Sequence, residues 1–148
     1  MIFVDTNIFY NILYETELTP KAKEAVDLLT KPVISVIVYN ELIYVTFRAY
    51  ARRKYGITSY HEYKKFFTEK GIDAFEEPLK DIHELLEGLD VKILSDHQSV
   101  EELREVITKY RLLPTDAQIA ITCKYYSIPT IATLDEDFKR IPWLKTIP

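Results

Sequence analysis

The chain opens with MIFVDTN, residues 1–7, and this stretch decides the expected fold. Its apolar residues are contiguous and lack helical spacing, which indicates a short buried strand. Asp5 ends that run, and a helical apolar pattern begins directly after it, at Ile8. A carboxylate between a strand and a helix lies where open α/β sheets bind their ligands. Asp5 or Thr6 is equally well placed to cap the helix, so both roles stay open.

The composition is that of an ordinary globular protein. A length of 148 residues, with 47% hydrophobic and 28% charged residues, fits one domain with a sizeable core. The single cysteine, Cys123, excludes an intramolecular disulfide and indicates a reducing compartment. No apolar run is long enough to cross a bilayer, and no signal-like segment is present. We therefore expect a soluble cytoplasmic protein, with residues 1–148 in a single domain and no membrane partner.

Strands alternate with helices along the chain. This order predicts an α/β fold, a three-layer α/β/α sandwich around a parallel sheet of four to five strands. Two consecutive helices at about residues 57–88 predict a helical insertion or arm after the long third helix, which runs from Ile37 to Tyr55. Ser95 or Asp96 is expected to cap a helix that ends at Tyr110. The predicted strands are residues 1–4, 33–36, 91–94 and 130–134, with 145–147 as a short edge strand.

The net charge of −4 hides an asymmetry. Residues 42–70 carry seven Lys or Arg and two Glu, a net charge of +5, whereas the rest of the chain carries −9. Tyrosines and phenylalanines are interleaved with these cations, a pattern that can follow a single nucleic-acid strand by phosphate pairing and base stacking. A solvated helical face explains most of the same residues. The candidate RNA-binding residues are Arg48, Arg52, Arg53 and Lys54.

Three further carboxylates stand out because of where they lie. Glu41 projects onto the apolar stripe of the long helix, where an unpaired carboxylate costs several kcal/mol. It must therefore be hydrated, salt-bridged or close to a cation. Asp116 shares a helix face with apolar residues, although the sequence from Thr115 to Gln118 also fits a capping box. Asp135 follows the fourth strand as Asp5 follows the first, and it too is placed to cap a helix.

Strand-to-helix junctions of a parallel sheet all fall on one edge, so these carboxylates can converge. Four carboxylates gathered without basic neighbours repel one another, and convergence therefore implies a cation. Oxygen ligands suit Mg²⁺ or Mn²⁺ rather than zinc. No Cys or His set has metal-binding spacing.

The four acidic segments together resemble those of PIN-domain nucleases. Asp5-Thr6-Asn7 resembles the first motif of that family, and residues 38–42 resemble its helix-borne Glu-Leu motif. Residues 113–120 resemble the third acidic motif and are the most distinctive match. Residues 131–138 are similar to the final motif. The resemblance spans the whole chain, with all four motifs in the family's order and spacing.

The resemblance implies a particular site. Asp5, Glu41 and Asp116 would be catalytic metal ligands or near-ligands, and Asp135 would complete the acidic cluster. Asp137 is the alternative acidic residue of the last motif and would share or replace the role of Asp135. The supporting polar groups would be Thr6, Asn7 and Thr133.

The implied activity is metal-dependent hydrolysis of phosphodiester bonds in single-stranded or structured RNA. The short length resembles VapC-type toxins, which implies a homodimer and a small antitoxin partner. The alternatives are a PIN-type RNA-processing nuclease, a non-catalytic scaffold that binds RNA or a partner, and an Asp-nucleophile phosphatase. Such phosphatases usually carry a second Asp where this chain has Asn7. Tyr39, Ile43 and Phe47 widen the apolar face of the long helix, which fits dimer contacts and core burial equally.

Overall fold

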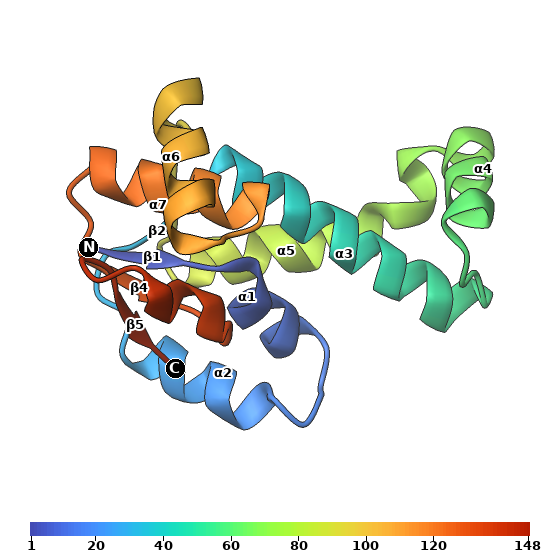
Figure 1. Ribbon diagram of the computed structural model, residues 1–148. Coiled ribbons are helices and arrows are strands. Elements are labelled where there is room, and N and C mark those ends of the chain that lie inside the picture. The colour runs from blue at the N-terminus through green and yellow to red at the C-terminus, as the bar shows by residue number, and fades with distance from the viewer.

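The central strand, β1 (Ile2–Val4), belongs to a five-stranded parallel sheet with the order β3-β2-β1-β4-β5 (Figure 1). The computed structural model describes residues 1–148. Every residue of β1 and β2 is buried, as expected for strands covered on both faces. The predicted parallel sheet is confirmed with five strands. The other four are β2 (Pro32–Ser35), β3 (Lys92–Leu94), β4 (Thr130–Ala132) and β5 (Lys145–Ile147).

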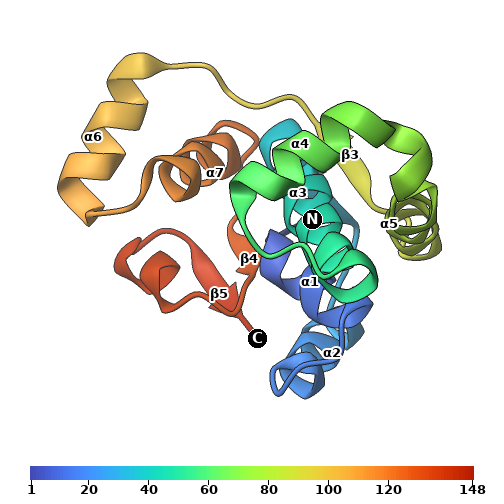
Figure 2. The same cartoon turned by 90° about the vertical axis from the view of Figure 1, so that its right-hand side faces the viewer.

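Helices cover both faces of the sheet, which confirms the predicted three-layer sandwich (Figures 1 and 2). One face carries α1 (Thr6–Leu13), α2 (Thr19–Asp27), α3 (Val36–Tyr55) and α5 (Glu76–Gly88). The other carries α6 (Val100–Tyr110), α7 (Pro114–Tyr125) and the 3₁₀ helix η2 (Glu136–Arg140). Right-handed crossovers give this distribution, because the chain moves from β1 to β3 in one direction and from β3 to β5 in the other.

The strand order changes direction at β1: β2 and β3 are added on one side of it, and β4 and β5 on the other. This change of direction places the site. Strands β1 and β4 are adjacent and parallel, with Val4 opposite Ala132. The backbone N–H of Asp5 extends their pairing by donating to the carbonyl oxygen of Ala132, at 2.9 Å. The residues that follow the two strands therefore meet at the carboxyl edge of the sheet. In open α/β sheets, this switch point is where ligands bind.

The helical segment that stands away from the sheet is shorter than residues 57–88. Helix α4 (Tyr60–Lys70) and the 3₁₀ helix η1 (Ile72–Phe75) lie against the far end of α3 (Figure 1). They form a small separate core around Phe75, whose ring stacks on Phe47 with centroids 4.7 Å apart. Helix α5 instead buries Ile82 and Leu86 in the main core. It belongs to the sandwich rather than to the projecting arm.

Core burial explains the wide apolar face of α3. Phe47 is buried in the small core, and Tyr39 and Ile43 pack against the main one. These side chains therefore give no separate support to a dimer interface. None of the helices in the structure combines the length and the apolar character needed to span a bilayer.

The expected cap of α6 is wrong. The helix begins at Val100, and its N-cap is Ser99, whose Oγ accepts a hydrogen bond from the backbone N–H of Glu102 at 3.2 Å. Ser99 and Glu102 have the spacing of a capping box, but the Glu102 carboxylate contacts His97 Nε2 at 2.7 Å instead of closing the box. Asp96 instead reaches the start of α3, where its Oδ2 accepts from the N–H of Ile37 at 3.0 Å.

Candidate active site

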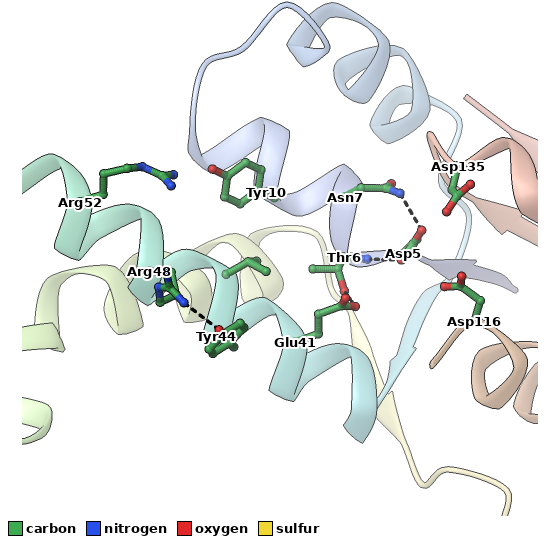
Figure 3. Close-up of a pocket in the computed structure, with 11 residues that line it drawn as sticks. Asp5, Thr6, Asn7, Tyr10, Glu41, Tyr44, Arg48, Arg52, Asp116 and Asp135 are labelled. Atoms are coloured by element: carbon green, nitrogen blue, oxygen red, sulfur yellow. Dashed lines mark hydrogen bonds between the residues drawn. The ribbon is translucent and has the colours of Figure 1, made fainter. Parts of the chain in front are cut away.

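An open cleft of about 460 Å³ lies at the carboxyl edge of the sheet (Figure 3). The four carboxylates singled out in the sequence all line it. They come from the end of β1, from α3, from the first turn of α7 and from the segment after β4. The structure thus brings together side chains that are far apart in the sequence: Asp5, Glu41, Asp116 and Asp135.

Asp5 is the most buried of the four, and the structure shows its capping role directly. Its Oδ1 caps α1 by accepting from the N–H of Thr6 at 2.7 Å. Its Oδ2 accepts from Asn7 Nδ2 at 2.7 Å and from Thr133 Oγ1 at 2.6 Å. Burial raises the pKa of Asp5 to about 7, opposed by the Thr133 hydrogen bond and reinforced by the charges of Glu41 and Asp116.

Glu41 lies in the second turn of α3 and is partly buried. Its Oε2 accepts a hydrogen bond from Thr6 Oγ1 at 2.6 Å. No basic side chain forms a salt bridge with it. Of the three explanations for a carboxylate on this stripe, the salt bridge is therefore excluded, which leaves water or a cation.

Asp116 does not belong to a capping box, so that expectation is wrong. Pro114 occupies the first position of α7, Leu113 is the N-cap, and no side chain caps the helix. The fixed φ of a proline suits this first position and starts the helix before Thr115. The Asp116 carboxylate makes no hydrogen bond or salt bridge with another side chain. Burial raises the pKa of Asp116 to about 6, with further increases from the charges of Asp135, Glu41 and Asp137.

The last motif contributes two carboxylates to one cluster. Asp116, Asp135 and Asp137 each offer an oxygen atom within 4.8 Å of the others. Asp135 caps η2 by accepting from the N–H of Asp137 at 2.8 Å, which leaves its second oxygen free. Asp137 forms an ion pair with Arg140 and is not part of the cleft lining. Asp135 thus lines the cleft, and Asp137 lies beside it, paired with Arg140.

Thr6, Asn7 and Thr133 connect the carboxylates to the backbone. Besides its bond to Asp5, Asn7 donates to Thr133 Oγ1 at 3.2 Å and accepts from the N–H of Leu134 at 3.0 Å. The Thr133 hydroxyl also accepts from the N–H of Asp135, at 3.0 Å. One network of neutral groups thus orients the acidic side chains without neutralising them.

This donor set fits a hard divalent cation. All of the converging atoms are oxygens, and no Lys, Arg or His lies within salt-bridge distance of Asp5, Glu41, Asp116 or Asp135. The only thiol, Cys123, is buried in the core. Carboxylate oxygens without nitrogen or sulfur partners are the ligands of Mg²⁺ and Mn²⁺.

The predicted basic residues divide into two pairs. Arg48 and Arg52 line the cleft. Arg53 instead lies over the ring of Tyr14, at 4.5 Å from its centroid, and Lys54 donates to the hydroxyl of Tyr50 at 2.8 Å. Helical phase separates the pairs, because Arg48 and Arg52 lie within about 20° of Glu41 around the helix, whereas Arg53 lies about 120° away.

Two aromatic residues of the cleft were not identified as site residues from the sequence. Tyr10 and Tyr44 line it together with the carboxylates (Figure 3). The signal for Tyr10 was its spacing, since it lies four residues after Thr6 and therefore one turn along the same face of α1. Tyr44 similarly follows Glu41 by three residues on α3.

The fold and the acidic cleft define this chain as a member of the PIN-domain family, whose family profile matches residues 2–144. It is 32% identical over 148 residues to ribonuclease VapC2 of Methanocaldococcus jannaschii, covering 99% of this chain and 92% of that protein. It is 30% identical to ribonuclease VapC6 of the same organism, covering 99% and 95%. Both relatives are VapC ribonucleases, as the motifs predicted.

Solved structures share the fold at lower identity. The sarcin-ricin loop cleaving toxin VapC20 of Mycobacterium tuberculosis superimposes with a TM-score of 0.65 over 100% of both chains, at 14% identity. VapBC2 of Rickettsia felis, solved with a fragment of promoter DNA, gives a TM-score of 0.63 at 22% identity, covering 99% of this chain and 97% of that one. The resemblance to the VapC fold is therefore confirmed along the whole chain.

Proposed function

We propose that this protein is a divalent-metal-dependent endoribonuclease whose reacting phosphodiester is bound at the four carboxylates of the cleft. One observation carries the proposal: Asp5, Glu41, Asp116 and Asp135 line one cleft, and none is paired with a basic side chain. Uncompensated carboxylates at a switch point need a cation, and their oxygens suit Mg²⁺ or Mn²⁺. The two related ribonucleases support RNA as the substrate.

When it is bound, a divalent cation polarises the phosphate, makes water a better nucleophile at neutral pH and stabilises the leaving oxygen. The chain's own residues prepare the ligands for it. Asn7 and Thr133 fix the Oδ2 atom of Asp5, and Thr6 fixes the Oε2 atom of Glu41. Asp116 has no hydrogen-bond partner, so both of its oxygens are available. None of the four carboxylates needs to act as a covalent nucleophile.

The raised pKa values of Asp5 and Asp116 describe the same site before the cation binds. Burial raises the pKa of Asp5 to about 7, so the metal-free Asp5 carboxyl keeps its proton to a far higher pH than a solvated carboxyl does. The Asp116 carboxyl, with a pKa of about 6, loses its proton at a lower pH than Asp5 does. Cation binding must release these protons, so affinity for the cation rises with pH.

We further propose that the nuclease is the toxin of a toxin–antitoxin pair and forms a homodimer. The VapC relatives support this role, and so do structures with the same fold, including a toxin–antitoxin complex from Klebsiella pneumoniae with a TM-score of 0.58. Light scattering should give twice the chain mass of 17.4 kDa. A small protein encoded next to this chain should suppress RNA cleavage at equimolar concentration. Unsuppressed cleavage would favour an RNA-processing role.

The test of the nuclease uses a fluorescent single-stranded RNA in Mg²⁺ or Mn²⁺. The wild-type chain should cleave it, and chelator should stop the reaction. Asp116→Asn should lower the rate about 1,000-fold, which corresponds to about 4 kcal/mol of transition-state stabilisation. This variant removes a charge but no hydrogen bond of Asp116, so its circular dichroism should match wild type.

Asp73→Asn is the matched control, since Asp73 is exposed in η1 and lies outside the cleft. It should cleave at the wild-type rate. A folded Asp116→Asn variant that cleaves as fast as wild type would contradict the proposal. Hydrolysis of a small phosphomonoester with RNA left intact would indicate the phosphatase instead. RNA binding in chelator with no turnover under any condition would indicate a non-catalytic scaffold.

A further inference from the structure

Helix α3 carries both acidic and basic side chains on the face that lines the cleft. Glu41, Val45, Arg48 and Arg52 follow one another at helical spacing, and all four belong to the lining (Figure 3). At 1.5 Å per residue, Arg48 lies about 10 Å and Arg52 about 16 Å beyond Glu41 along the helix axis. When one phosphate of a strand is held at the carboxylates, the two guanidinium groups therefore lie beside the adjacent phosphates of the same strand.

Arg48 is held in position by neutral groups. Its Nη1 donates to the hydroxyl of Tyr44 at 2.9 Å, and its Nη2 donates to the carbonyl oxygen of Thr58 at 3.2 Å. The guanidinium also lies 5.3 Å from the ring centroid of Tyr63 and 5.8 Å from that of Tyr60. These contacts occupy two of its five N–H donors and leave its charge uncancelled. The remaining donors are free to bind an anion.

Neither Arg48 nor Arg52 forms a salt bridge, although four carboxylates line the same cleft. Tyr10 of α1 and Tyr44 of α3 add aromatic rings to the same wall, and Tyr44 is 44% exposed. Free cations interleaved with accessible rings are the means by which proteins bind single-stranded nucleic acid.

We propose that this wall, formed by Tyr10, Tyr44, Arg48 and Arg52, is a binding track for single-stranded RNA. Arg48 and Arg52 bind the backbone phosphates next to the reacting one, and the two tyrosines stack on unpaired bases. The inference rests on the proposed nuclease function and names the residues that position its substrate. An RNA duplex keeps its bases stacked and paired, so it cannot use the tyrosines. The track therefore selects an unpaired segment.

The test measures RNA binding rather than cleavage. A labelled single-stranded oligonucleotide is titrated with the full-length Asp116→Asn variant, which the proposed function makes inactive, and affinity is followed by fluorescence anisotropy against salt concentration. Adding Arg48→Gln or Arg52→Gln should each reduce the slope of log affinity against log salt by about 0.7, the value for one lost phosphate contact on a single strand. Adding Tyr10→Leu should lower affinity about tenfold and leave the slope unchanged.

Arg53→Gln is the matched control, because Arg53 is the next residue on α3 but lies over Tyr14 outside the cleft. It should change neither affinity nor slope. An unchanged slope in either of the other arginine variants, or an equal fall in the Arg53→Gln variant, would overturn the track. Cleavage by the wild-type chain is measured separately, so loss of the track and loss of the nuclease are distinguishable.

Discussion

The acidic and basic ends of the cleft differ in how far their charged side chains are buried and in whether they need a counter-ion. At the acidic end, four carboxylates are gathered without a cation from the chain, and burial raises the pKa of Asp5 to about 7. At the basic end, Arg52 is exposed, whereas Arg48 is partly buried and is held by hydroxyl, carbonyl and aromatic groups. In both places neutral partners fix the geometry without cancelling the charge. The acidic end, being buried, is the one that needs an external counter-ion.

The largest expected effect is a fall in the stability of the metal-free protein as pH rises. Between pH 4 and pH 7 the unfolded chain has lost the Asp5 proton, whereas the folded chain still holds it. The stabilising contribution of this raised pKa is present below pH 4 and is lost as pH rises to about 7, by about 4 kcal/mol. Urea unfolding in chelator at several pH values measures it.

Excess Mg²⁺ should flatten this pH dependence, because the cation stabilises the charged form. Asp116→Asn should flatten it in chelator, since it removes the Asp116 carboxyl and one charge that raises the pKa of Asp5. Equal stability of the metal-free wild-type protein at pH 5 and pH 8 would show that the acidic end carries no uncompensated charge.

A smaller effect is expected when the hydrogen bonds that orient the carboxylates of the acidic end are removed. Thr133→Val keeps the side-chain shape but removes the hydroxyl that contacts Asp5, Asn7 and the N–H of Asp135. We expect a loss of about 2 kcal/mol in the free energy of unfolding and a cation affinity at least tenfold weaker. Thr133→Ser restores the hydroxyl and should restore both quantities. If Ser and Val behave alike, the hydroxyl does not orient the carboxylates.

The smallest effect concerns the helix that carries both ends. Asp96 accepts a hydrogen bond from the N–H of Ile37 at the start of α3. Asp96→Ala should lower the free energy of unfolding by about 1 kcal/mol, the usual contribution of a helix cap. Asp96→Asn keeps an oxygen acceptor and should recover most of it. A loss of RNA cleavage without loss of stability would instead give Asp96 a part in the site.

The fold was predictable because its strands are short apolar runs and its junctions carry distinctive residues. The run ending in Asp5 predicted both the central strand and the edge of the sheet where the site lies. Glu41 and Asp116 were detectable because a charge on an apolar helical stripe is costly without a partner. Their convergence followed from parallel topology alone.

What the sequence did not reveal depends on competition between nearby groups. Ser99 caps α6 in place of Ser95 or Asp96, and Asp96 instead accepts a hydrogen bond from the N–H of Ile37. Pro114 displaced the expected capping box of α7 by fixing where that helix begins. The role of α5 in the main core was hidden because its apolar pattern looks the same in an arm and in a sandwich. Local cap chemistry decides the first two outcomes, and tertiary contacts decide the third.

The most direct test of the uncompensated acidic cluster is a titration of the metal-free chain with Mn²⁺, with free Mn²⁺ counted by electron paramagnetic resonance at pH 7.5. Wild type should bind Mn²⁺, Asp116→Asn should bind it at least tenfold more weakly, and Arg48→Gln should match wild type. Equal Mn²⁺ affinity in wild type and Asp116→Asn, or no binding by the folded wild-type chain, would contradict the assignment of these carboxylates as a cation site.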